Sequence, residues 1–171
     1  MNQMEKGPVL FWSGHFSQWD MESPFEVGGM RYNCAEQFMM RQKALLFGDR
    51  ETANKIMKQA EPKKQKALGR EVSGFDDLVW LQHARPIVFL GNLAKFTQNP
   101  GHLKLLMGTG NRLIAEASPM DRLWGIGLAA NNPLAQSQTT WEGRNWLGEV
   151  LMAVRKTIGS GLGSFALAAA T

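Results

Sequence analysis

The sequence contains a single cysteine, Cys34, among its 171 residues. One cysteine cannot form an internal disulfide bond or a Cys-x-x-Cys metal site, and it favours a reducing compartment. Histidine is also scarce. His15, His83 and His102 are the three histidines, and they lack the spacing of an HExxH metal-binding helix. We therefore predict no metal site, no other cofactor and a cytoplasmic protein.

Long apolar segments are missing as well. The first residues, MNQMEKGP, are not followed by the apolar run of about 7–15 residues that a secretory signal peptide requires. Nor is any stretch long enough to span a bilayer. The sequence thus predicts neither a signal peptide nor an association with membranes.

The composition is typical of a globular domain with a buried core. A length of 171 residues suits one domain, and hydrophobic residues make up 44%. A net charge of +4 is compatible with an anionic ligand, such as a phosphate or a nucleic acid. Six tryptophans accompany one tyrosine, and several lie beside glycine. Such rings can stack on a base or can pack beneath loops, and the composition favours neither role.

The segment YNCAEQFMMRQKALLF, residues 32–47, has the pattern of a helix. Asn33 is a favourable N-cap, and Glu36 stands where the partner of a capping box belongs. No glycine or proline follows before Phe47, and most of the residues are strong helix formers. At about 100° per residue, Gln37 and Arg41 share the side that we expect to face solvent.

Glu36 and Lys43 fall together on the otherwise apolar side of this helix. They are separated by two turns, which is about 10 Å along the helix axis. Burying a charge costs several kcal/mol unless the group is paired or its pKa shifts. One interpretation is therefore a pocket wall that presents an acid and an amine. The alternative is a Glu36 that closes the capping box and a Lys43 that reaches the solvent from the helix margin.

The remaining elements follow from periodicity and from turn residues. Gly28-Gly29 predicts a two-residue β-hairpin, and Pro86 should kink or restart the helix that contains it. The lysines of 63–66 are interpreted mainly as a solvated face. We expect strands at 9–12, 24–27, 30–32, 113–115 and 123–128, and helices at 49–59 (capped by Asp49), 62–68, from Asp76 or Asp77 through 96, 100–107 (capped by Asn99) and 147–158 (capped by Asn145).

A second acidic segment, EASPMDRLWGIG, places Glu116 at a strand end and Asp121 five residues later. Sites are often built on loops that follow strand ends. Asp121 precedes Trp124-Gly125, so an acid, a stacking ring and accessible backbone lie in one short loop. Alternatively, Asp121 pairs with Arg122 or caps the turn.

Six ordered blocks together resemble one known family, the YbiA-like or NADAR domain, named after NAD and ADP-ribose. The resemblance extends from about Leu10 to Ile158. The blocks are FWSGHFSQW, PFEVGGMRYNCAEQFMMRQKALLFGD, KALGREVSGF, GNLAKFTQNP, LIAEASPMDRLWGIGL and GRNWLGEVLMAVR. The resemblance implies a predominantly helical α+β domain with a small antiparallel sheet, spanning residues 1–158. We expect residues 159–171 to form a flexible tail.

The resemblance also implies N-glycosidase chemistry on ribosyl compounds. Members of the family remove ADP-ribose from guanine in nucleic acid, often beside a toxin that attaches it, or hydrolyse ribosylamino-pyrimidine phosphates of the riboflavin pathway. The basic charge favours ADP-ribosylated DNA. By position, the catalytic groups correspond to Glu36, Lys43, Glu116 and Asp121. The expected substrate contacts are Trp124, Gly125, Gly127, Asn145, Phe16 and Trp80.

Lys43 is the expected nucleophile. Desolvation can lower the pKa of a lysine, and a neutral amine can attack the anomeric carbon and form a Schiff base. Glu36 would then move the proton, while Glu116 or Asp121 would bind the ribose or act as a second acid or base. The alternative from another functional class is a non-catalytic module that binds ADP-ribose.

Overall fold

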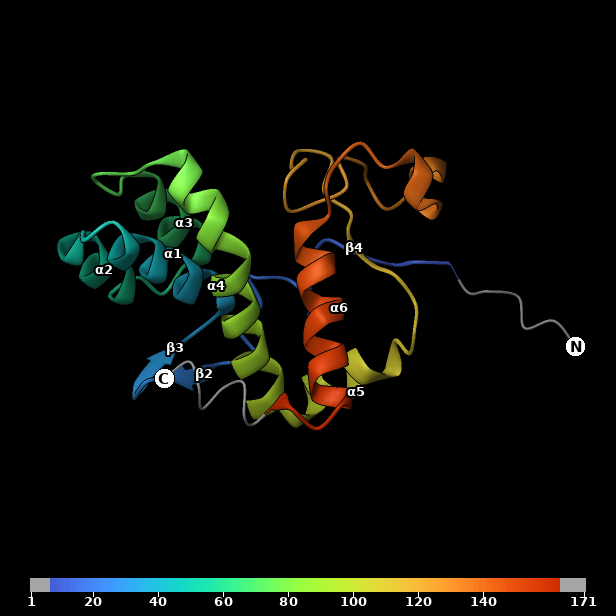
Figure 1. Ribbon diagram of the computed structural model, residues 1–171, viewed down its shortest axis with the longest axis horizontal. Coiled ribbons are helices and arrows are strands. Elements are labelled where there is room, and N and C mark those ends of the chain that lie inside the picture. Colours follow the sequence, from blue (N-terminus) through green and yellow to red (C-terminus); the bar gives the residue numbers. More distant parts are fainter. Residues whose placement is uncertain (1–6, 164–171) are drawn as a thin grey trace, which may run out of the picture.

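The computed structural model describes residues 7–163, and Figure 1 shows its arrangement. It is predominantly helical, as the sequence predicts, and contains two small sheets. Ser164 to Thr171, which make up most of the predicted tail, lie outside the described residues. The elements are β1 (Val9–Phe11), β2 (Phe25–Val27), β3 (Met30–Tyr32), α1 (Ala35–Leu46), α2 (Arg50–Met57), α3 (Pro62–Arg70), α4 (Asp77–Gln98), α5 (Pro100–Gly108), β4 (Ile114–Glu116), the 3-10 helices η1 (Pro133–Gln136) and η2 (Gln138–Thr140), and α6 (Trp146–Gly159).

The long helix α4 runs between the group formed by α1, α2 and α3 and the helix α6 (Figure 1). Its apolar side chains join those of α1 and α6 in one core. Fully buried members of that core include Ile56, Leu93, Phe96, Leu106, Ile114, Leu147 and Leu151. Within residues 7–163, no helix is both long and apolar enough to cross a membrane.

Two of the predicted helix starts are confirmed by their side-chain bonds. The Asp49 carboxylate accepts a hydrogen bond from the Thr52 backbone N–H at 2.9 Å and caps α2. Asp76 caps α4 in the same way, through the backbone N–H of Val79 at 2.9 Å. Of the two effects expected at Pro86, a kink or a restart, the restart does not occur. Pro86 is exposed, so water can bind the carbonyl that proline leaves without an N–H partner, and α4 continues.

The hairpin at Gly28-Gly29 is confirmed, with β2 and β3 antiparallel. Both glycines have positive φ, 58° and 72°, as a tight two-residue turn requires. The second sheet was not predicted: β1 and β4 pair in parallel, with Val9 opposite Ile114 and Phe11 opposite Glu116. The strand expected at 123–128 does not form. Carbonyls of residues 123–126 accept N–H groups from residues 142–147 and the Ile126 N–H donates to Glu116, but these bonds do not make a strand ladder.

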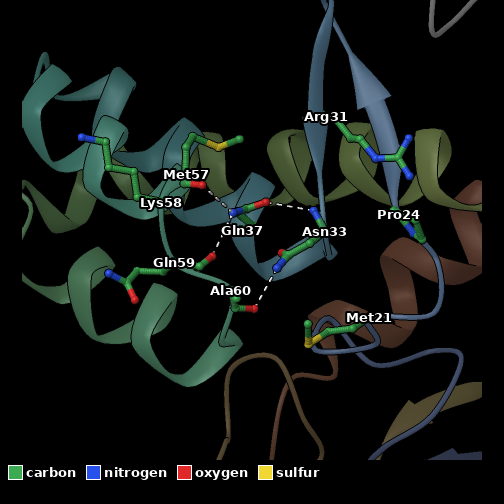
Figure 2. Close-up of a pocket in the computed structure, with 9 residues that line it drawn as sticks. All are labelled: Met21, Pro24, Arg31, Asn33, Gln37, Met57, Lys58, Gln59 and Ala60. Carbon is green, nitrogen blue, oxygen red and sulfur yellow. Dashed lines mark hydrogen bonds between the residues drawn. The ribbon is translucent and has the colours of Figure 1, made fainter.

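The predicted capping box of α1 is wrong. Cys34 occupies the N-cap position and makes no side-chain cap bond, while the Asn33 amide donates to the Ala60 carbonyl at 2.8 Å. Gln37 is also not on the solvent side. It is 4% exposed, and Figure 2 shows its amide pointing at the segment between α2 and α3, where it donates to the Gln59 carbonyl at 3.2 Å. Backbone carbonyls there need buried donors, and Gln37 supplies one.

Candidate active site

Glu36 lies in the first turn of α1 and is only 5% exposed. Burial raises the pKa of its carboxyl to about 7. The positive charge of Lys66 and the Trp19 side chain, acting as a hydrogen-bond donor, lower that pKa, whereas the negative charge of Asp121 raises it. Glu36 is therefore a carboxyl group that can give or take a proton near neutral pH.

Glu116 ends β4 and has the same electrostatic character. Burial is the main cause that raises its pKa to about 7, and Asp121 and Glu36 raise it further, while Lys66 lowers it. Its Oε2 atom is buried and has no hydrogen-bond partner among the described residues. Because Asp121 and Lys66 both shift the pKa values of Glu36 and Glu116, we group these four residues as the carboxyl cluster.

Asp121 is fixed in this cluster by the loop that follows β4. One carboxylate oxygen accepts the backbone N–H groups of Leu123 and Trp124, at 2.9 and 2.8 Å. Asp121 thus caps its turn, one of the two alternatives that the sequence allowed. A pair with Arg122 is not formed, because Arg122 binds Glu142 at 2.8 Å. The turn holds a negative charge beside the two buried glutamates.

Gly125 packs against the backbone between the two acids of this loop. A Cβ atom at Gly125 would lie 2.8 Å from the Asp121 carbonyl oxygen and 3.0 Å from that of Glu116. Gly127 has a φ of 72°, a conformation that favours glycine. These two predicted substrate contacts therefore shape the backbone that carries Glu116 and Asp121.

Asn145 connects the start of α6 to β4. Its side chain is buried, donates to the Ile114 carbonyl at 2.9 Å and accepts from the Glu116 N–H at 3.1 Å. The sequence predicted that Asn145 caps α6. Asn145 occupies the N-cap position, but its side chain makes no cap bond, because its backbone is left-handed, with φ 53°. Gly148 allows this close contact, since a Cβ atom there would lie 2.0 Å from the Ile114 carbonyl oxygen.

Lys43 is half-buried near the C-terminal end of α1. Its amine donates to the Gly69 carbonyl of α3 at 2.7 Å and lies 4.1 Å from the centre of the Phe75 ring and 5.5 Å from that of Trp80. Burial lowers the pKa of Lys43, and the charges of Asp77 and, more weakly, of Glu36 oppose this effect. The amine therefore lies beside the aromatic rings of Phe75 and Trp80, and the charge of Glu36 affects its pKa.

Comparison with known proteins identifies the family of the chain. The sequence matches the NADAR domain over residues 5–159. The chain belongs to the NADAR domain family. A protein of Acanthamoeba polyphaga mimivirus named as an N-glycosidase is 48% identical over 125 residues, which cover 73% of this chain and 74% of that protein. A Nostoc punctiforme protein, also named as an N-glycosidase, is 33% identical over 127 residues and 72% of each chain.

The NMR structure of the E. coli protein YbiA has the same fold. It superimposes with a TM-score of 0.75 at 23% identity and covers 92% of this chain and 88% of YbiA. The YbiA-like α+β fold that the sequence predicts is thereby confirmed.

Two residues of this NADAR domain that the sequence reasoning missed are Trp19 and Lys66. Trp19 is 43% exposed, and its ring centre lies 5.9 Å from the Lys66 amine. Both act on Glu36. Trp19 belongs to the block FWSGHFSQW that carries the family resemblance, so its position contained a signal. Lys66 was assigned to a solvated lysine run, and only the fold brings it to the carboxyl cluster.

Two predicted substrate contacts of the NADAR domain have aromatic neighbours. Trp124 contacts Trp146 edge to face, with ring centres 5.6 Å apart. Phe16 lies between Phe11 and Phe96, with ring centres 5.7 and 6.2 Å away, and packs against the core. Phe16 also lines a hollow of about 690 Å³ that contains none of the carboxyl cluster.

A second hollow of about 480 Å³, drawn in Figure 2, is lined from α2, the hairpin and the α2–α3 segment. It too lacks the carboxyl cluster and Lys43. Neither hollow therefore coincides with the titratable groups of the carboxyl cluster. We place the candidate active site at the groups whose pKa values are shifted by burial and by one another, because such groups mark catalytic positions.

Proposed function

We propose that this protein is an N-glycosidase that removes ADP-ribose from ADP-ribosylated guanine in nucleic acid. The names of two relatives, both N-glycosidases, support the reaction class. The observation that carries the proposal is the pair Glu36 and Glu116. Glu36 is buried and Glu116 is half-buried, each has a pKa raised to about 7, and the buried Oε2 of Glu116 has no partner within residues 7–163.

Cleavage of an N-glycosidic bond needs a proton for the departing base and a negative group near the developing positive charge. The sugar passes through an oxocarbenium-like state, which a nearby carboxylate stabilises. A carboxyl with a pKa near 7 is a general acid at neutral pH. Glu36 and Glu116 supply that acid, and Asp121, anchored in its turn, supplies the fixed negative charge.

Lys43 is the proposed nucleophile. Its neutral amine attacks the anomeric carbon, the bond from that carbon to guanine breaks, and guanine takes a proton from the general acid. The sugar ring opens to a Schiff base on Lys43, and water hydrolyses it to free ADP-ribose and the amine. The lowered pKa of Lys43 supports this role, because a larger share of the amine is then neutral. Glu36, whose charge affects the pKa of Lys43, transfers the proton between the attack of the amine and the hydrolysis of the Schiff base.

The surface beside the carboxyl cluster suits an anionic substrate with a planar base. Lys66 and Arg70 of α3 both act electrostatically on Glu36, and Lys63 is exposed on the same helix. Their charges can bind the phosphates of ADP-ribose or of nucleic acid. The exposed ring of Trp19 offers a face for stacking on a base. These features favour an ADP-ribosylated nucleic acid over a smaller ribosyl phosphate.

The decisive experiment compares turnover on two substrates. Purified protein is incubated with DNA that carries ADP-ribose on guanine and, separately, with ribosylamino-pyrimidine phosphates. We expect release of free ADP-ribose from the DNA, loss of at least about 100-fold in Lys43→Ala, and normal rates in Lys156→Ala, whose lysine is exposed on α6. Faster hydrolysis of the pyrimidine phosphates would assign the alternative substrate. Tight ADP-ribose binding without turnover, unchanged in Lys43→Ala, would assign a binding module.

The covalent step has its own test. Borohydride reduces a Schiff base to a stable amine, so its addition during turnover should attach one sugar to a peptide that contains Lys43. Lys156→Ala should label as the wild type does, and Lys43→Ala should not label. Continued turnover in wild type without any trapped adduct would show that the carboxyl groups act without a covalent lysine.

A further inference from the structure

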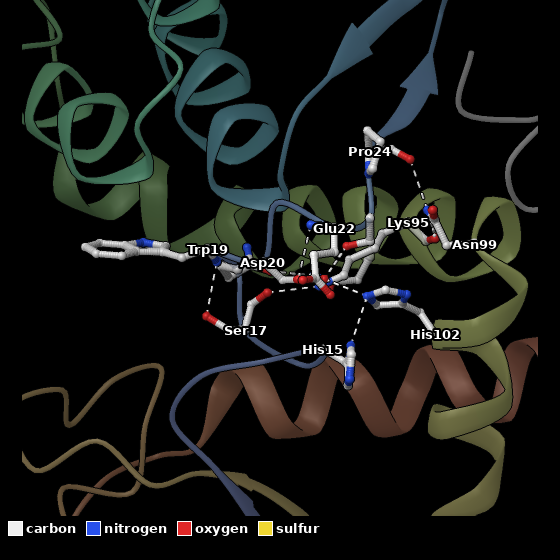
Figure 3. A network of polar contacts seen from close by, with 12 residues as sticks. His15, Ser17, Trp19, Asp20, Glu22, Pro24, Lys95, Asn99 and His102 are labelled. Carbon is white, nitrogen blue, oxygen red and sulfur yellow. Dashed lines mark hydrogen bonds and ion pairs between the residues drawn. The ribbon is translucent and has the colours of Figure 1, made fainter.

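A polar cluster away from the carboxyl cluster joins His15 and Asp20 of the β1–β2 loop to His102 of α5 (Figure 3). The ring atom Nε2 of His102 lies 2.7 Å from Asp20 Oδ2 and 3.2 Å from His15 Nδ1. One ligand atom from each residue lies within 4.8 Å of the other two. His102 and Asp20 are each 9% exposed, whereas His15 is exposed. The cluster therefore combines two buried ligands with one at the surface.

The single nitrogen Nε2 of His102 faces two partners that it cannot both satisfy as ordinary hydrogen bonds. A neutral imidazole nitrogen carries either a proton or a lone pair. If Nε2 donates its proton to Asp20, His15 Nδ1 can share that proton only as the weaker half of a bifurcated bond, and if Nε2 accepts from His15, it faces a carboxylate without a proton. A cation between the three residues removes this conflict, because all three atoms then present lone pairs to it.

The surrounding residues hold Asp20 and its loop in place. Ser23 donates to Asp20 Oδ2, and the Lys95 amine lies 3.5 Å from the same oxygen. Lys95 is fully buried and also donates to the Ser17 carbonyl at 2.9 Å. Asp20 Oδ1 accepts one bond, from the Glu22 N–H at 3.3 Å. An ion bound at Oδ2, the oxygen that faces His102, would therefore share that oxygen with Ser23 and Lys95.

We propose that His15, Asp20 and His102 bind one Zn²⁺ ion. Two histidine nitrogens and one carboxylate, with water as the fourth ligand, form a common zinc set. Ligand bonds of about 2.0 Å at tetrahedral angles place the ligand atoms about 3.3 Å apart. The two histidine nitrogens are 3.2 Å apart, whereas His102 Nε2 and Asp20 Oδ2, at 2.7 Å, have to separate slightly to admit the ion. The protein has one cysteine, Cys34, which is buried and bonded to Gln65, so sulfur does not compete in this site.

The ion would join the β1–β2 loop to α5. His15 and Asp20 flank the segment 16–19, which carries Trp19, and Trp19 acts on Glu36 in the carboxyl cluster. Zinc binding would therefore fix the segment that carries the Trp19 ring, which lies at the candidate active site. This role goes beyond the proposed function and does not depend on it, since no step of the glycosidase reaction uses these three residues.

The test uses the full chain without a histidine tag, treated with a chelator and then titrated with Zn²⁺ against a chromophoric competitor. We expect one saturable equivalent of zinc. The melting temperature should rise by roughly 5–10 °C at a free zinc concentration about 100 times Kd. Co²⁺ in place of Zn²⁺ should give the visible absorption of a tetrahedral site.

Histidine variants identify the ligands. His102→Gln and His15→Gln should each weaken zinc binding by at least about tenfold, whereas His83→Gln, on the exposed face of α4, should bind as the wild type does. Because His15 is exposed, His15→Gln keeps the fold even if His102→Gln does not. The proposal is overturned if no saturable binding occurs, or if His15→Gln binds zinc as tightly as wild type. Neither readout involves turnover, so failure here leaves the proposed function intact.

Discussion

Replacing Asn145 by alanine should destabilise the protein strongly, because its side chain bonds two backbone groups of β4. The Ile114 carbonyl is buried, and it and the Glu116 N–H would lose their partner. Leaving a buried polar group unpaired costs about 1–3 kcal/mol. Alanine also tolerates the left-handed backbone at φ 53° less well than asparagine, at about 1 kcal/mol. We expect Asn145→Ala to lose about 3–6 kcal/mol of unfolding free energy.

Urea unfolding followed by tryptophan fluorescence measures this loss as a lower midpoint with an unchanged slope. Asn145→Gly should lose about 1 kcal/mol less, since glycine accepts the left-handed backbone but makes neither bond. The control Asn132→Ala removes a bond to the Leu134 N–H at an exposed turn and should cost about 0.5–1 kcal/mol.

The reasoning is refuted if Asn145→Ala unfolds within about 1 kcal/mol of wild type and yet loses turnover. The Asn145 amide would then act on the substrate, the role that the family resemblance implied. A large loss of stability that Asn145→Gly partly recovers would instead assign it to holding β4, and with it Glu116, against α6.

Three further predictions concern the carboxyl cluster. Burial raises the pKa of Glu116 from 4.5 to about 7, so the folded state holds a proton that the unfolded state releases, and the free energy of unfolding falls as pH rises through that window. Between pH 5 and pH 8, urea unfolding of Glu116→Gln should show a fall in unfolding free energy smaller than that of wild type by about 1–3 kcal/mol. An equal fall in the two proteins would contradict this prediction. Gly125→Ala should cost about 1–3 kcal/mol in urea unfolding and at least tenfold in kcat, because its Cβ would press on two carbonyl oxygens. Gly108→Ala, with open space around it, should not destabilise the protein in the same urea assay. Lys66→Ala should move the alkaline fall of kcat/KM to higher pH by about half a unit or more, because Lys66 lowers the pKa of both buried carboxyls. The matched variant Lys63→Ala should leave the pH profile in place, and equal profiles for the two variants would remove Lys66 from the site.

Local features of the fold were predictable because each depends on a few neighbouring residues. The Asp49 and Asp76 caps and the Gly28-Gly29 hairpin need only the chemistry of a turn or a first helical turn. Burial of Glu36 on the apolar side of its helix also followed from the 3.6-residue period. That period was less reliable for Gln37, because a polar residue at a buried position can be stabilised by backbone carbonyls from another segment.

Contacts between distant segments could not be derived from local pattern. The pairing of β1 with β4 joins residues about a hundred positions apart, and His15 meets His102 across 87 positions. Lys66 looked like one of several surface lysines until α3 was packed against α1. Local pattern indicated the candidate acids and the amine and the family resemblance gave them catalytic roles, whereas the electrostatic coupling among them depends on the fold.

The parallel pairing of β1 with β4 has a consequence for biosynthesis. Val9 emerges early from the ribosome, but its partner Ile114 follows only after α1 to α5 have been made. Until then the nascent polypeptide contains Glu36 and Lys43 without Glu116, so half of the proposed machinery waits for the other half. Premature termination before β4 should therefore yield an inert product, and closing so long a loop should make docking of the first strand a late folding event.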